Sequence, residues 1–183
     1  SLVDPDNRRP VDYRRRHEML SKLQGRIDAV GDDLRPLAAE LLANVPDGRV
    51  KLYLIYRALH FRRANEQLFA HGTYVPLEAS GPKRDHVCAF VRSAGEEAVL
   101  VVVPRLVVHL AGGVEQPPMG PEVWETTRVA LPPALASRRW RNVFTGETLT
   151  AEDQEGAFGL SLAAALGAFP VALLECCPAE TPA

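Results

Sequence analysis

Long apolar runs are missing from this sequence, and so is any large excess of charge. The longest apolar run, 98–103, ends at Pro104 and Arg105, far short of the roughly 18–20 residues that a membrane span needs. The 21 lysines and arginines face 23 acidic residues, which leaves a formal net charge of −2. This balance gives no bulk attraction to nucleic acid or to acidic membranes. We therefore expect neither of them as a partner.

Cysteine is also scarce. Cys88, Cys176 and Cys177 have no metal-ligand spacing and form no disulfide pattern, because adjacent cysteines rarely bridge each other. We expect all three to be small buried apolar residues in a reducing compartment, and we place the protein in the cytoplasm. The histidines are not spaced as metal ligands either. No metal or cofactor is predicted.

Helical periodicity fills the first part of the chain. It predicts helices over 11–23, 34–44 and 49–70, with Asp33 as a possible cap of the second. The third is the strongest, because apolar residues surround almost its whole circumference. A helix that is apolar on nearly all sides is buried. We expect it to need neighbours on two faces.

From Gly72 onward the pattern alternates, and glycines and prolines punctuate short runs. We expect an antiparallel sandwich of roughly seven or eight strands. The predicted strands are 74–79, 86–92, 98–103, 105–110, 125–131, 141–144, 147–150 and 169–176. The run 98–103 is apolar on both faces, which predicts a central strand. Segment 113–123 is expected to be an irregular loop, and 157–167 fits a strand edge or a helical turn.

The opening stretch 4–13 reads Asp-Pro-Asp-Asn-Arg-Arg-Pro-Val-Asp-Tyr. Its prolines stiffen the backbone, and the acids and arginines supply acceptors and donors suited to sugar hydroxyls. Taken alone, composition favours the simpler interpretation that the same residues brace a loop against the helix that follows, since surface ion pairs are common and weak.

This stretch resembles the loop after the last barrel strand in the trehalose-forming glucosylmutases of the alpha-amylase family of glycoside hydrolases. Segment 50–63 resembles the last barrel helix of that family, and 72–77 and 140–146 resemble its C-terminal domain. The resemblance implies an α+β chain: residues 1–71 would be the last loop and helices of a catalytic (β/α)8 TIM barrel, and residues 72–183 a C-terminal antiparallel β-sandwich domain.

The implied reaction converts the reducing-end α-1,4 link of a malto-oligosaccharide into an α,α-1,1 link. Its catalytic carboxylates come from earlier barrel strands of the family, so we assign no catalytic residue in this chain. The resemblance places Asp4 and Arg8 against the sugar, while Asp6 and Arg9 mainly brace the loop with a lesser chance of contact. The implied partners are the malto-oligosaccharide and the remainder of the barrel.

An alternative is a non-catalytic structural or glucan-binding module of another hydrolase of this family. Exposure of Tyr74, Trp124 and Trp140 in a row would favour glucan binding, because exposed rings stack on sugars. Burial of these rings would favour a structural role. We expect the tryptophans to be core residues, since aromatic side chains supply much of a core's buried area.

Overall fold

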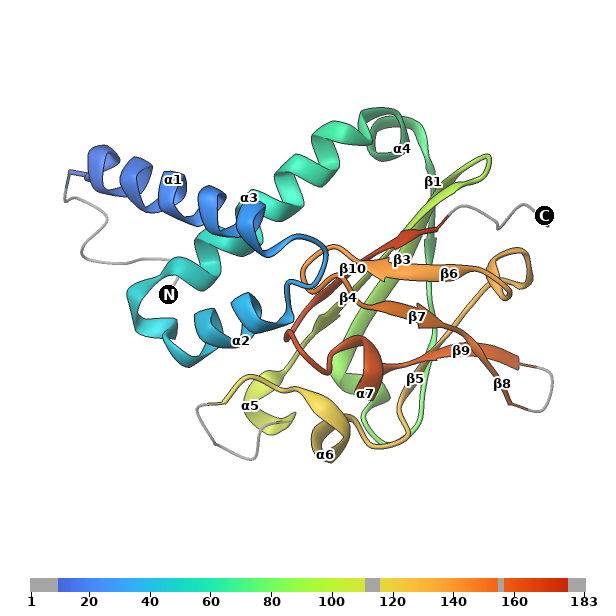
Figure 1. Ribbon diagram of the computed structural model, residues 1–183. Helices are drawn as coiled ribbons and strands as arrows, with labels where there is room; N and C mark the ends of the chain where they lie inside the picture. The colour runs from blue at the N-terminus through green and yellow to red at the C-terminus, as the bar shows by residue number, and fades with distance from the viewer. Residues whose placement is uncertain (1–9, 111–115, 155–156, 178–183) are drawn as a thin grey trace.

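Helices form the first part of the chain and antiparallel strands the second (Figure 1). The computed structural model describes residues 10–110, 116–154 and 157–177. The helical part consists of α1 (Tyr13–Val30), α2 (Arg35–Ala43), the 3-10 turn η2 (Val45–Asp47), α3 (Arg49–Ala64) and α4 (Glu66–His71). The expected α+β class with antiparallel sheets is confirmed.

The helix boundaries differ from the predicted ones at two points. α1 runs past the predicted end and stops at Gly31, whose φ of 72° is in the left-handed region that favours glycine. The predicted helix 49–70 is two helices, because Asn65 leaves helical geometry (φ −115°, ψ 42°). The Asn65 side-chain amide donates to the Phe61 carbonyl at 2.9 Å. This bond satisfies a carbonyl at the end of α3.

Two antiparallel sheets follow. The six-stranded sheet has the order β1-β3-β4-β10-β6-β7, and the four-stranded sheet β2-β5-β9-β8. The strands are β1 (Thr73–Pro76), β2 (Ala79–Ser80), β3 (Val87–Ala94), β4 (Glu97–Pro104), β5 (Arg128–Ala130), β6 (Arg139–Asn142), β7 (Thr148–Thr150), β8 (Glu152–Gln154), β9 (Ala157–Ser161) and β10 (Ala172–Cys176). Short 3-10 turns lie at η3 (Arg84–His86) and η4 (Pro133–Leu135).

β4 packs against both the four-stranded sheet and the helices, and so joins the three layers of the fold: helices, six-stranded sheet and four-stranded sheet. Its Leu100 and Val102 belong to the core between the two sheets, whereas Val99 belongs to a second core under the helices. Successive side chains of a strand point to opposite faces. A strand that is covered on both sides must therefore be apolar at every position, which is why 98–103 lacks alternation. The prediction of a central strand is confirmed.

The structure corrects two predictions for the chain after β4 and resolves a third that had left two alternatives open. Residues 105–110 are not a strand: Leu106 has a φ of 53°, and the chain then forms the short helix α5 (Val107–Leu110). A positive φ is incompatible with an extended strand. Segment 113–123 is not wholly irregular, because α6 (Gly120–Trp124) begins within it. Segment 157–167 contains both alternatives, β9 and then α7 (Leu162–Ala165).

The helical end of a barrel is not shown in this chain. In the described ranges the strands pair antiparallel, and α1–α4 pack on one face of the six-stranded sheet (Figure 1). The domain division at residues 71 and 72 stays a prediction. The change from helical to alternating periodicity, which suggested this division, coincides with the end of α4 and the start of β1.

Candidate functional site

The sugar-contacting residues predicted from the sequence lie outside the described residues; they are Asp4, Asp6, Arg8 and Arg9. Their role stays a prediction. The described chain begins at Pro10, and Asp12 is the N-cap of α1, since its carboxylate accepts a hydrogen bond from the Arg15 backbone N–H at 2.9 Å. The predicted loop is therefore followed at once by a capped helix.

The first half of α1 has little cover. Tyr13 is 76% exposed and His17 is exposed, whereas Leu23 is buried. By helical spacing these three residues lie on one face of α1. Only the second half of α1 reaches the core under the helices, because α1 extends beyond the sheet at its N-terminal end (Figure 1).

α3 has one covered face and one bare face. Tyr53 is buried against the sheet, but Ile55 and Leu59 are 42% and 58% exposed. These two residues are four apart, so they lie one turn apart on the same side of the helix. The prediction that α3 needs neighbours on two faces is met on one side. On the other side an apolar pair faces solvent.

The covered face of α3 is clamped to the segment that follows β6. The Tyr53 hydroxyl donates to the Phe144 carbonyl at 2.5 Å, and Arg57 donates from Nε and Nη2 to the Val143 carbonyl at 3.0 and 2.7 Å. Burial raises the pKa of Tyr53 to about 12, so its hydroxyl stays a donor over the whole neutral range. The clamp fixes α3 relative to the six-stranded sheet.

Gly146 lies at the other end of this contact. Its φ is 81°, and a Cβ there would meet the Asp32 carbonyl oxygen, between α1 and α2. The Leu34 backbone N–H donates to the Thr145 carbonyl at 3.0 Å. Only a glycine lets the turn after β6 approach the helices this closely.

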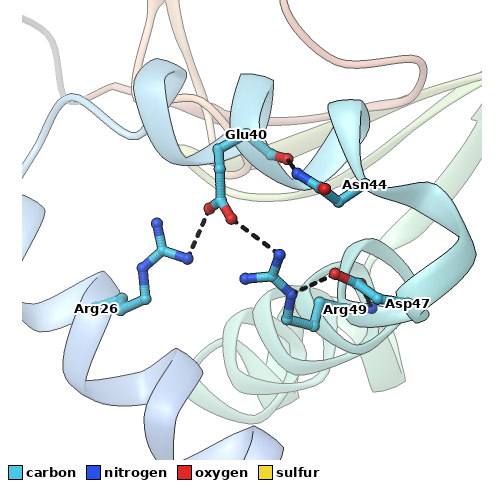
Figure 2. Close-up of polar contacts among 5 residues, drawn as sticks. All are labelled: Arg26, Glu40, Asn44, Asp47 and Arg49. Atoms are coloured by element: carbon cyan, nitrogen blue, oxygen red, sulfur yellow. Dashed lines mark hydrogen bonds and ion pairs between the residues drawn. The ribbon is translucent and has the colours of Figure 1, made fainter.

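An ion-pair network joins the helices to each other (Figure 2). Glu40 on α2 lies between Arg26 on α1 and Arg49 at the start of α3, with oxygen–nitrogen distances of 2.6 and 2.9 Å. Arg49 also pairs with Asp47 at 2.7 Å. The Asn44 amide donates to the Glu40 backbone carbonyl at 2.8 Å. One carboxylate thus ties three helices together.

The carboxylates with shifted pKa values are engaged in such braces. Hydrogen bonds from Arg35 lower the pKa of Asp33 to about 2, and hydrogen bonds from Arg26 and Arg49 lower the pKa of Glu40. The pKa of Asp47 is lowered by its hydrogen bonds with Arg49. A general acid for glycosidic bonds needs the opposite shift. These three carboxylates therefore serve the structure.

A groove runs between the second half of α3 and the strands β4, β6 and β10. It consists of two cavities of about 430 and 220 Å³, both lined by Phe61 and Glu175. Its charged lining residues are Arg57, Arg138, Arg141, Glu96, Glu97 and Glu175. We call this the α3 groove. Three arginines against three glutamates give it a formal net charge of zero.

Tyr74, Trp124 and Trp140 do not form the exposed row that would favour glucan binding. Trp124 and Trp140 are fully buried in the core between the sheets, as expected. Tyr74 is 52% exposed, and its ring lies 4.9 Å from that of Phe90. This burial favours a structural role for the two tryptophans.

The cysteine prediction was wrong about burial. Cys88 is exposed, and Cys176 and Cys177 are half-buried. Val87 and Ala89, the strand neighbours of Cys88, belong to the core between the sheets, so Cys88 lies on the opposite face of the sheet. All three thiols are free. Among the described residues there is no group of three metal-ligating side chains, and none of their helices is long and apolar enough to cross a membrane.

Sequence reasoning missed the residues that connect the helices to the sheet. Tyr53 and Arg57 were read only as part of an apolar helix, and Glu40 and the α3 groove were not singled out. Tyr53 and Phe144 are 91 residues apart in the chain. The spacing of Tyr53 and Arg57, one helical turn, was the only local signal that they share a face.

Comparison with known proteins adds to this geometry. No protein-family model matches the chain. Two proteins of Mycobacterium tuberculosis, from strains CDC 1551 / Oshkosh and H37Rv, are 33% identical to it over 148 residues, and each is named "Putative maltooligosyl trehalose synthase". The aligned part is 81% of this chain but only 14% of each relative.

A solved structure gives the same result. A mutant maltooligosyltrehalose synthase from Arthrobacter ramosus matches with a TM-score of 0.62 and 28% identity. The match covers 97% of this chain and 18% of that one. The chain is therefore similar to a small part of these much longer enzymes. This confirms the resemblance to trehalose-forming enzymes that was predicted from the opening stretch.

Proposed function

We propose that this chain is the C-terminal portion of a maltooligosyl trehalose synthase, a (1→4)-α-D-glucan 1-α-D-glucosylmutase. Such an enzyme would convert the reducing-end α-1,4 link of a malto-oligosaccharide into an α,α-1,1 link, which yields maltooligosyl trehalose for trehalose biosynthesis. The observation that carries the proposal is the likeness to these synthases over 97% of the chain, helices and sheets included.

The bare face of the helices supports a place beside a larger body. Ile55 and Leu59 on α3 and Tyr13 on α1 would be covered by a preceding catalytic barrel, since exposed apolar surface commonly marks an interface. We propose that residues 1–71 supply the last loop and helices of that barrel. Residues 72–183 would then form the appended C-terminal β-sandwich domain.

The reaction would be a retaining double displacement through a covalent glucosyl intermediate. Its nucleophile and acid/base would come from the preceding part of the protein. Asp4 and Arg8 would hydrogen-bond the sugar, and Asp6 and Arg9 would brace the loop. The freed glucose must re-attack before water does, so this loop would help to close the pocket. Carboxylates suffice as nucleophile and acid/base for these steps, so we propose no cofactor. The cytoplasmic location stays a prediction.

Conversion of maltopentaose to its trehalose-ended isomer by the full-length protein tests the proposal, with released glucose measured in parallel. Asp4→Ala and Arg8→Ala should each lower kcat/KM about 10- to 100-fold, as expected for the loss of a hydrogen bond to a charged group. Glucose release should rise relative to transfer. Asp28→Ala and Arg14→Ala, at exposed positions on α1, are the matched controls.

No conversion by the unmodified full-length protein would refute the proposed function. Unchanged turnover and product ratio in Asp4→Ala and Arg8→Ala would refute only the role of the loop. In that case the loop would be a brace.

A further inference from the structure

We propose that the α3 groove binds a stretch of neutral α-1,4-glucan chain. The inference deepens the proposed function and rests on it for the identity of the sugar. The groove itself is argued from the polar groups that line it.

Donors and an acceptor meet in this groove. The guanidinium of Arg57 is held in place because its Nε and Nη2 both donate to the Val143 carbonyl, which leaves Nη1 available. His60 has its Nδ1 at 2.9 Å from the Tyr56 carbonyl oxygen and its ring 3.9 Å from that of Tyr56, which leaves Nε2 without a hydrogen-bond partner among the described residues. Glu175 lines both cavities and is half-buried, and its carboxylate has no hydrogen-bond or ion-pair partner in the part of the chain that the structure describes.

The charge of the groove selects against ionic ligands. Arg138 is already paired with Glu96, and Arg141 with Asp32 at 2.5 Å. An anion would still meet Glu97 and Glu175, and a cation would meet the three arginines of the lining. A neutral ligand with many hydroxyls avoids both conflicts, because each hydroxyl can donate to a carboxylate and accept from a guanidinium. The lining therefore favours a sugar over a phosphate or a metal ion.

Shape and apolar surface agree with this choice. The larger cavity, about 430 Å³, is within the range of roughly 300–1,000 Å³ typical of small-molecule sites. Phe61 lines both cavities and is held edge-on by Phe69, with ring centroids 6.0 Å apart. A fixed ring between the two cavities offers an apolar surface to the C–H face of a sugar. The groove would then hold a long glucan on the enzyme.

Affinity electrophoresis of the full-length protein through a gel that contains soluble starch tests the proposal. Glu175→Ala removes the uncommitted acceptor, and Ala64→Trp fills the smaller cavity from an exposed helix position. Each should weaken retention by starch about tenfold. Glu122→Ala and Ala164→Trp, at exposed positions on α6 and α7, should be retained like the unmodified protein.

Circular dichroism confirms that each variant is folded, and Ala64→Trp decides the matter if Glu175→Ala does not fold. Equal retention of the unmodified protein and Ala64→Trp would overturn the proposal. So would a loss of retention in the two control variants, or an unmodified protein that starch does not retain. The maltopentaose assay is independent of these readings, so failure of the groove and failure of the proposed function are distinguishable.

Discussion

Replacement of Tyr53 by phenylalanine isolates the clamp between α3 and the sheet. Tyr53 is fully buried, and its hydroxyl donates to the Phe144 carbonyl at 2.5 Å. Tyr53→Phe keeps the ring and its edge-on contact with Phe169, at a centroid distance of 6.0 Å. It deletes the hydrogen bond and leaves a carbonyl without that donor. The free energy of unfolding should fall by about 1–3 kcal/mol near neutral pH.

The effect should depend on pH in a defined direction. The pKa of Tyr53 is raised from 10.0 to about 12 by burial. Above pH 10 the unfolded chain releases this proton while the folded chain keeps it, so stability falls as pH rises from about 10 to 12. With these values the loss at pH 11 is about 1.4 kcal/mol. Tyr53→Phe has no hydroxyl to titrate and does not lose this stability, so the difference in unfolding free energy between it and the unmodified chain should shrink by that amount at pH 11.

Urea unfolding of the 183-residue chain at pH 8 and pH 11 measures both terms. Tyr74→Phe is the matched control, because Tyr74 is half-exposed, and it should change the unfolding free energy by less than about 0.5 kcal/mol at either pH. A deficit of Tyr53→Phe that is zero at pH 8, or one that grows at pH 11, would refute the reasoning.

Three further predictions concern the helices and their contacts. Gly146→Ala should destabilise the chain by more than about 2 kcal/mol, because Gly146 has a positive φ and a Cβ there would meet the Asp32 carbonyl. Gly95→Ala, where φ is also positive but the space is open, should cost only about 1 kcal/mol. Thermal unfolding compares the two variants, and equal losses would contradict the close contact. Glu40→Gln should lower the unfolding free energy by about 0.5–1 kcal/mol at pH values above the ordinary carboxyl pKa of 4.5, and by less in 1 M salt. The difference from the unmodified chain should vanish as pH falls through the lowered pKa of Glu40, and a deficit that persists in acid would argue against the ion pairs. Leu59→Lys should barely change the melting temperature of this chain but should lower that of the full-length protein, if a preceding barrel covers α3; equal shifts in both would contradict that cover.

The local sequence pattern predicted correctly those features that depend on which faces of an element are apolar. The doubly apolar run 98–103 required a strand covered on both faces, and β4 is that strand. The helix 34–44 is α2 within one residue at each end. Burial of Trp124 and Trp140 followed from their size. These features depend on neighbours in sequence or on bulk hydrophobicity, which the sequence displays directly.

Local pattern failed where the backbone changes direction. The apolar residues after Pro104 look like another strand, but the positive φ of Leu106 turns them into α5. The break at Asn65 lies between Phe61 and Leu68, which are seven residues apart and so keep the spacing of one continuous helix. Periodicity does not report a single residue's φ and ψ. For that reason these boundaries could not be predicted.

The sequence by itself determined the change from helices to strands near residue 72, the central strand, and the likeness to trehalose-forming enzymes. Only the tertiary structure decided which side of α3 is covered and which is bare. It also decided that Glu40 joins three helices, and that α3 and the strands enclose a groove of zero net charge. The physical reason is that these features come from groups far apart in the chain. Tyr53 and Phe144, 91 residues apart, meet only when the helices pack on the sheet.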